Sequence, residues 1–221
     1  MLKTRFLAIS LFVFSFCGPT ASFAQDNMPT LERIAQTGKI RIGYGTDAPF
    51  SYPGPDGNII GYSIDLCRGV VDRLKQKLGL PAIEVEFVAR TPSNRIQLLN
   101  EGKIDIECNS STNTEERRKS AAFSLSYFFA TTRYVSLAKN NLATLEDLKG
   151  RSVGVALGTV NIAPVIEINR KRKLNISVVP AETLQGAFDM VTDGQVSGFA
   201  MDEVLLKMMI ARSGKPQEYS L

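Results

Sequence analysis

The chain has 221 residues with 26 Lys and Arg against 22 Asp and Glu, a formal net charge of +4, and it contains no histidine. This mild and mostly scattered positive charge does not indicate a nucleic-acid-binding protein. The lack of histidine excludes acid–base catalysis and metal binding through an imidazole group.

Residues 1–24 have the pattern of a cleaved secretory signal peptide. A short cationic start precedes the apolar run "FLAISLFVFSF", which is too short to span a bilayer, and Ser22 and Ala24 are the small residues that precede a cleavage site. A lipid anchor on Cys17 is the alternative, but the bulky Phe16 before it fits that processing poorly. We therefore expect a cleaved signal peptide and a periplasmic protein.

Strands and helices alternate along the rest of the chain. The hydrophobic patterns predict strands at 39–44, 83–88, 104–107, 151–156, 175–180 and 196–201. They predict helices at 63–79, 93–102, 160–173 and 182–194, with Ser63 as the N-cap and Gly79 as the end of the first of these. This alternation is typical of parallel βαβ units.

The same plan occurs twice, which predicts two α/β lobes rather than one continuous sheet. We place the first lobe at residues 25–130 and the second at 131–216, with the β-branched and aromatic segment 127–139 as the strand that crosses between them. Polar stretches follow the predicted strands, at 45–52, 91–95, 108–117, 157–159 and 202–203. Because ligands of open α/β sheets bind beyond the carboxyl ends of strands, these stretches predict a cleft between the lobes.

Several motifs in the sequence have a structural interpretation that is simpler than a functional one. Residues 43–48 match the Gly-x-Gly-x-x-Ala dinucleotide fingerprint, but prolines and glycines follow in place of the required helix, so we reject it. Ser110 has no histidine to activate it, which excludes a common hydrolase triad. Residues 115–119 read as an exposed helical turn with paired charges. Arg95 is either a surface residue or a ligand contact, and Asp202 is either an N-cap or a ligand contact.

These segments resemble the solute-binding proteins of polar amino-acid ABC importers, closest to the glutamate/aspartate-binding type. The resemblance rests on "LERIAQTGKIRIGYGTDAPFSY", "GYSIDL", "SNRIQLLNEGKIDIECNSSTNTEERRKSAAFS", "LEDLKGRSVGVALGT" and "GFAMDEVLL". It implies the two-lobed periplasmic binding protein fold of type II, an α/β fold in which each lobe is a mostly parallel sheet flanked by helices. It also implies a hinge that closes on a free amino acid, with no cofactor and no metal, in a monomer that docks on permease subunits in the inner membrane.

The resemblance also implies roles for particular residues. Arg95 matches the arginine that binds the α-carboxylate, and Asp202 matches the acceptor of the α-ammonium group. A guanidinium suits the first role because it donates two parallel hydrogen bonds. The other expected contacts are hydroxyl or backbone donors and an aromatic wall, at Ser110, Ser111, Thr112, Thr159, Phe50 and Tyr52.

The sequence departs from the acidic-amino-acid binders at three places. Gly45-Thr46 stands where they carry an arginine, Leu184 where they carry a histidine, and Pro92 where they carry a serine. Because a ligand carboxylate buried without a partner is costly, we expect a neutral amino acid to be preferred over glutamate or aspartate.

The family continues beyond the end of this chain, so the resemblance implies that the C-terminal part of the first lobe is missing and that residues 217–221 begin a return crossover. It leaves open whether Cys108 pairs with Cys67 or with a cysteine of the missing part. Two other functions remain possible on this fold. One is a periplasmic dehydratase of prephenate-like acids, which needs a carboxylic acid such as Asp47 or Glu203 in the cleft, and the other is a detached sensory ligand-binding domain.

Overall fold

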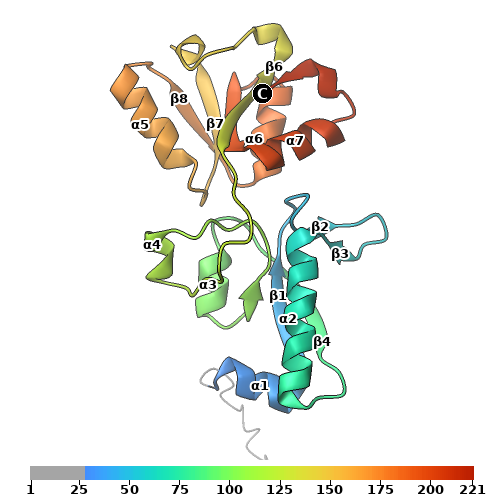
Figure 1. Cartoon of the computed structure of the whole chain (residues 1–221). Coiled ribbons are helices and arrows are strands. Elements are labelled where there is room, and N and C mark those ends of the chain that lie inside the picture. Colours follow the sequence, from blue (N-terminus) through green and yellow to red (C-terminus); the bar gives the residue numbers. More distant parts are fainter. Residues whose placement is uncertain (1–27) are drawn as a thin grey trace, which may run out of the picture.

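The computed structural model describes residues 28–221 and has two α/β lobes, one above the other in Figure 1. The predicted signal peptide and Cys17 lie outside the described residues. The first lobe, named the smaller lobe for the size of its sheet, contains a three-stranded parallel sheet, and the second, the larger lobe, contains a five-stranded mixed sheet. The two-lobed fold predicted from the sequence is therefore confirmed.

The smaller sheet has the strand order β4-β1-β5. Its strands are β1 (Lys39–Tyr44), β4 (Glu84–Ala89) and β5 (Ile106–Glu107), and a separate hairpin is formed by β2 (Tyr52–Pro53) and β3 (Ile59–Ile60). Four helices accompany them: α1 (Thr30–Thr37), α2 (Tyr62–Leu78), α3 (Arg95–Asn100) and α4 (Glu115–Arg118). Alternation within β1 buries Ile40 and Ile42 against the inner face of α2.

One detail of α2 differs from the sequence prediction, and another answers a question that the sequence left open. Gly79 ends the helix in the left-handed conformation, as predicted, but Ser63 is not the N-cap. The helix begins one residue earlier, and the buried Ser63 hydroxyl instead donates to the backbone carbonyl of Asn109 at 3.1 Å. Cys67 of α2 forms a disulfide with Cys108, which settles the pairing and ties the helix to the end of β5.

The larger sheet has the strand order β10-β6-β9-β7-β8. Its strands are β6 (Thr132–Leu137), β7 (Ser152–Ala156), β8 (Ser177–Ala181), β9 (Gly198–Asp202) and β10 (Tyr219–Ser220). The helices are α5 (Ile162–Arg172), α6 (Leu184–Thr192) and α7 (Glu203–Arg212), with short 3₁₀ turns η2 (Ala138–Asn140), η3 (Glu146–Leu148) and η4 (Pro216–Glu218). Apolar residues of β7 and β9 are buried on both faces, as expected for central strands between helices.

The segment that crosses between the lobes is less regular than predicted. Residues 122–131 form no helix or strand, and β6 begins only at Thr132, inside the larger sheet, where it runs antiparallel to β9 (Figure 1). Residues 217–221, expected to begin a return crossover, contribute β10 at the edge of that sheet beside β6. Among residues 28–221, no helix is long and apolar enough to cross a membrane.

Candidate functional site

A narrow cleft lies where the carboxyl ends of strands from the two lobes meet. Residues after β1, β4 and β5 line one side, and residues after β7, at the start of α6 and at the end of β9 line the other. This is the place that the sequence predicted. The lining consists of Asp47, Arg90, Pro92, Arg95, Ser110, Ser111, Thr112, Arg117, Thr159, Val160, Asn161, Leu184, Met201 and Asp202.

Arg95 begins α3, and its side chain turns inward instead of facing solvent. It is 5% exposed, its Nη1 group donates to the carbonyl of Pro92, and its Nη2 group donates to the carbonyl of Gly158 at 3.1 Å. Its buried Nε group has no hydrogen-bond partner within residues 28–221. Burial lowers the pKa of Arg95 to about 10, and the charge of Arg117 acts in the same direction.

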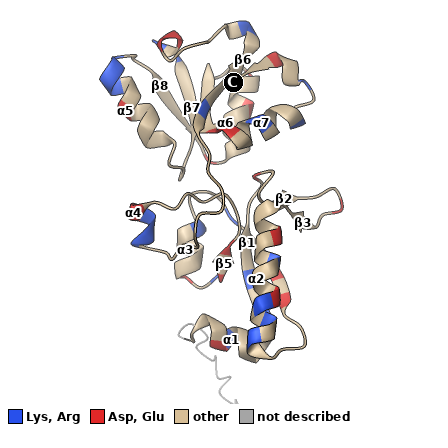
Figure 2. Ribbon diagram, viewed as in Figure 1, with Lys and Arg blue, Asp and Glu red and all other residues tan. Residues whose placement is uncertain are grey.

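Arg117 is the cleft residue that the sequence analysis missed. Its run of charged neighbours was read as an exposed turn, and Figure 2 shows that basic turn, α4, at the side of the smaller lobe that faces the larger one. Thr114 caps the turn by accepting from the Arg117 N–H, and this directs the Arg117 side chain into the cleft. Its guanidinium donates to the carbonyls of Thr112 and Gly158, both at 2.9 Å.

Asp202 is the acidic group on the opposite side of the cleft. It ends β9 and sits at the N-cap position of α7, but its side chain makes no capping hydrogen bond. Its Oδ1 atom instead accepts from the Asn161 amide at 3.2 Å, and Asn161 also donates to Thr132 at 2.9 Å. Burial raises the pKa of Asp202, while the Asn161 hydrogen bond and the charge of Arg117 oppose this rise.

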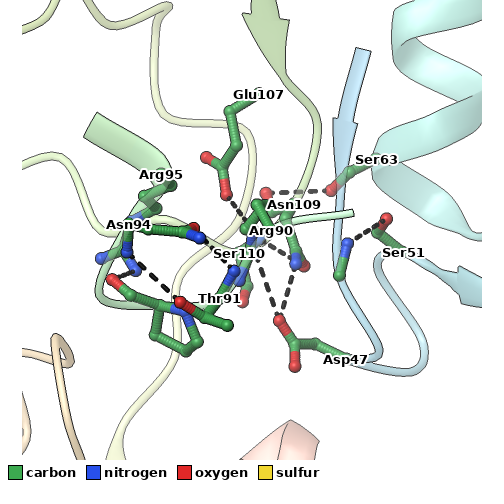
Figure 3. Close-up of polar contacts among 12 residues, drawn as sticks. Asp47, Ser51, Ser63, Arg90, Thr91, Asn94, Arg95, Glu107, Asn109 and Ser110 are labelled. Atoms are coloured by element: carbon green, nitrogen blue, oxygen red, sulfur yellow. Dashed lines mark hydrogen bonds and ion pairs between the residues drawn. The ribbon is translucent and has the colours of Figure 1, made fainter. Parts of the chain in front are cut away.

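A buried charged network forms the floor of the cleft and was also missed (Figure 3). Arg90 lies between two carboxylates: its Nη2 group donates to Asp47 Oδ2 at 3.2 Å, and its Nε atom is 2.9 Å from Glu107 Oε1 in an ion pair. The Asn109 amide donates to the same Asp47 oxygen at 2.6 Å, while its own oxygen accepts from the Ser110 N–H at 2.8 Å. The network therefore fixes the start of the polar loop 109–114.

The close packing of this network explains why Gly45 follows β1. A Cβ atom at this position would lie 2.4 Å from the Asn109 amide nitrogen, 2.9 Å from Asp47 Oδ2 and 3.1 Å from Arg90 Cζ. The side chains of Asn109, Asp47 and Arg90 thus occupy the space that a side chain at position 45 would need. The charge of Arg90 is shared by two carboxylates, Asp47 and Glu107, so Arg90 does not replace the arginine that the acidic-amino-acid binders carry after the first strand.

The predicted hydroxyl row lies in the cleft. Ser110, Ser111, Thr112 and Thr159 all line it. The buried Ser111 hydroxyl has no hydrogen-bond partner among the described residues, and the Thr159 hydroxyl donates to the Ala156 carbonyl at 2.7 Å. Ser110, Ser111 and Thr112 therefore provide short hydroxyl groups beside the two arginines, whereas the hydroxyl donor of Thr159 is already used.

The two aromatic residues predicted as a wall differ in position. Phe50 is buried and lines an adjoining hollow under the crossing segment, together with residues 123–130. This hollow shares Ser110, Ser111, Thr112, Val160 and Asp202 with the cleft, so Phe50 lies next to the proposed site. The Tyr52 ring packs beneath the guanidinium of Arg212, 5.1 Å from its centroid, and is not part of the cleft lining. Pro92 and Leu184, noted as departures from the acidic binders, do line the cleft.

The arrangement suits a small zwitterion. Arg95 and Arg117 present cationic groups, Asp202 presents an anionic group, and none of the three has an ion-pair partner within residues 28–221. The same residues contain no cluster of three or more His, Cys, Asp or Glu side chains placed to hold a metal ion. Glu203, a candidate catalytic acid, instead pairs with Lys207 at 2.6 Å, which lowers its pKa.

The chain is similar in sequence to known binding proteins. Residues 40–180 match the model of the bacterial extracellular solute-binding proteins, family 3. A curated relative, the L-glutamate/L-aspartate-binding protein of Pseudomonas aeruginosa, is 36% identical over 86% of this chain. The chain spans 64% of the length of that relative.

Solved structures share the fold. Holo ArgBP from T. maritima matches with a TM-score of 0.73 at 28% identity, covering 86% of this chain and 78% of that one. The ancestral amino acid-binding protein AncCDT-1, described as a precursor of cyclohexadienyl dehydratase, matches with a TM-score of 0.71 at 29% identity, covering 81% of this chain and 77% of that one.

Proposed function

Because the chain belongs to the family 3 bacterial extracellular solute-binding proteins, we propose that it binds a free amino acid in the cleft between its lobes and delivers it to an ABC importer. Hinge closure around the ligand is the working motion, since contacts from both lobes favour the closed form. The permease subunits of the importer are the proposed partners, in the periplasm. The protein acts as the binding subunit and performs no chemistry on the ligand.

One observation carries the proposal: Arg117 and Asp202 are oppositely charged, come from different lobes and line one cleft without ion-pair partners in the described chain. The ligand α-carboxylate would bind Arg117 with the donors of Ser111 and Thr112 beside it. The α-ammonium group would donate to Asp202. A ligand that satisfies both charges connects the two lobes and so stabilises closure.

This assignment changes the role that the resemblance gave to Arg95. Burial and the charges of Glu107, Arg90 and Asp202 act on the pKa of Arg117, whereas the charges that act on Arg95 are those of Arg117, Glu107, Arg90 and Asp47. Arg117 is therefore the arginine beside the proposed ammonium site. Arg95 lies toward the floor of the cleft, where the ligand side chain would extend.

A thermal-shift screen of the twenty amino acids tests the proposal. A ligand that binds only the folded state raises the melting temperature by mass action. The amino acid with the largest effect is then compared with its α-amide and with its deaminated analogue by calorimetry. We expect both analogues to lose at least tenfold in affinity, and a protein that responds to no amino acid would refute the proposal.

Catalysis on the same fold is the alternative. AncCDT-1 is named as the precursor of a dehydratase, and Asp47 places one carboxyl group in the cleft of this chain. The curated relative is named as a binding protein, and Glu203 is turned toward Lys207. Incubation with prephenate decides between the two: phenylpyruvate formation would establish an enzyme, and its absence together with amino-acid binding supports the proposed function.

A further inference from the structure

The floor of the cleft presents an anion and a cation to the same small space. We define this distal subsite by Asp47, Arg90 and Arg95, with Glu107 behind Arg90 (Figure 3). The Asp47 side chain is 7% exposed, and both of its hydrogen bonds, from Arg90 and Asn109, go to Oδ2. Its Oδ1 atom accepts no hydrogen bond from the described residues and remains available to a donor in the cleft.

Arg95 provides the complementary donor. Its guanidinium donates one hydrogen bond to each of two backbone carbonyls, those of Pro92 and Gly158, and no carboxylate pairs with it within residues 28–221. A guanidinium has five N–H donors, so further donors remain. A buried cation with spare donors strongly favours an acceptor atom on a bound ligand.

The charges of the distal subsite already balance. Arg90 and Arg95 supply two positive charges, and Asp47 and Glu107 supply two negative charges. A ligand side chain with its own charge would therefore introduce an unbalanced charge into a buried site. Burial of an unpaired charge is unfavourable, because the interior replaces little of the hydration that is lost.

On the basis of the proposed function, we propose that the distal subsite selects an amino acid with a neutral carboxamide side chain. The amide oxygen accepts from Arg95, and the amide NH₂ group donates to Asp47 Oδ1. A carboxamide carries an acceptor and a donor on one planar group and satisfies both partners without adding charge. The inference assigns Asp47 and Arg95 as the residues that determine side-chain specificity.

Other side chains satisfy only one of the two partners. A carboxylate accepts from Arg95 but is repelled by the like charge of Asp47. A guanidinium or ammonium group donates to Asp47 but is repelled by the like charge of Arg95. An aliphatic side chain leaves both polar groups without partners. Sites that hydrogen-bond a ligand group discriminate strongly against analogues that lack it, because the buried polar groups of the site are then left unpaired.

Competition calorimetry on the full chain tests the inference. Glutamine, asparagine, glutamate, aspartate, arginine and leucine are compared at neutral pH. We expect glutamine or asparagine to bind at least tenfold more tightly than its acidic counterpart and than arginine or leucine. Glutamate or aspartate that binds as tightly as its amide would overturn the inference while leaving the proposed function intact, whereas binding of no amino acid would refute the proposed function itself.

The Asp47→Asn variant tests the role of Asp47 directly. Removing its charge leaves the subsite with a net positive charge, so the preference for the amide over the acid should fall at least tenfold. The matched control is Asp65→Asn, because Asp65 is exposed on α2 and, within residues 28–221, its carboxylate pairs only with Arg68. An unchanged preference in a folded Asp47→Asn protein would overturn the assignment, and if that variant does not fold, the wild-type competition alone decides.

Discussion

Arg95 and Arg117 donate to the same acceptor, the carbonyl oxygen of Gly158, at 3.1 Å and 2.9 Å. Both arginines belong to the smaller lobe, and Gly158 follows β7 in the larger lobe. Two like charges therefore converge on one neutral carbonyl, and the charge of Arg117 helps to lower the pKa of Arg95. This contact joins the lobes and places two cations where an anionic group of a ligand would relieve their repulsion.

Replacing Gly158 with alanine should hinder closure. Gly158 has a φ angle of +75°, and a Cβ atom there would lie 2.4 Å from the Pro92 carbonyl oxygen and 2.6 Å from its carbon. Because the obstructing atoms are backbone atoms of the other lobe, the lobes must separate. We expect ligand affinity to fall at least tenfold and ligand-induced compaction in small-angle X-ray scattering to disappear.

The control for this variant is Gly150→Ala. Gly150 has a similar φ angle of +71°, but no atom lies within 4 Å of the position of its Cβ. Both variants carry a similar backbone strain of about 1 kcal/mol, and only one of them introduces a clash between the lobes. Equal affinities of the two variants would show that the contact of Gly158 with Pro92 does not limit closure.

Arg117→Ala and Asp202→Ala should each remove a ligand anchor. Truncating one partner of a buried charge pair typically costs about 2–5 kcal/mol of binding free energy, because the other charge remains unpaired. We expect more than tenfold weaker binding of every amino acid in calorimetry, with an unchanged melting temperature of the free protein. Arg118→Ala is the matched control for Arg117, since Arg118 is exposed and its side chain donates to Asn113 on the same segment, outside the cleft lining. Equal effects of the two arginine variants would remove Arg117 from the site.

Asp105→Asn should destabilise the smaller lobe without affecting ligand binding. The Asp105 side chain is 4% exposed, pairs with Arg33 and Arg41, and accepts from the Arg41 N–H at 2.7 Å. Burial alone would raise its pKa, but the hydrogen bonds from Arg41 and Arg33 outweigh burial and lower it. Loss of one partner in such a buried pair costs about 3–5 kcal/mol of folding free energy, which urea denaturation at neutral pH measures.

The same group predicts a pH dependence of stability. Because the pKa of Asp105 is lower in the folded protein, its contribution is present above the unfolded value of about 3.9 and is lost as the pH falls below it. The stability difference between wild type and Asp105→Asn should therefore shrink in acid. A difference that is independent of pH would mean that the charge of Asp105 is not what stabilises the lobe.

The fold and the location of the cleft followed from the sequence because they depend on local patterns. Alternating residues in β1 and the helical periodicity of α2 mark those elements, and parallel strands place their carboxyl ends at one edge of a sheet. The segment that crosses between the lobes was predicted as a strand because residues 127–131 are aromatic and β-branched. These residues instead pack as an irregular chain over the neighbouring hollow.

Arg117 and the Arg90 network could not be predicted in the same way. The run of charges that contains Arg117 has the composition of a solvated turn, and only the cap at Thr114 and the approach of the second lobe direct one of its side chains inward. The network joins Arg90 and Asn109 to Asp47 through contacts that exist only after folding. Asp47 and Asn109 lie more than 60 residues apart in the sequence. Spacing in the sequence carries no signal of such contacts.

Ligand selectivity should change with pH through Asp47. Burial raises the pKa of Asp47. The charge of Arg90 opposes this rise, and the charge of Glu107 adds to it. Arg95 and Asn109 are the other charged or polar groups that face Asp47. A pKa above the ordinary value means that Asp47 takes up a proton at a higher pH than a free carboxyl group does. The protonated group carries no charge and can donate a hydrogen bond, so it would accept a ligand carboxylate.

We therefore expect glutamate to gain affinity relative to glutamine as the pH falls from neutral towards about 4.3, the side-chain pKa of free glutamate, above which most of this ligand remains ionised. Calorimetry in buffers of different ionisation enthalpy should show that glutamate binding takes up a proton and that glutamine binding does not. Asp47→Asn should abolish the uptake, because the amide does not titrate. A glutamate-to-glutamine affinity ratio that stays constant over this range, with no proton uptake, would exclude Asp47 as the titrating group.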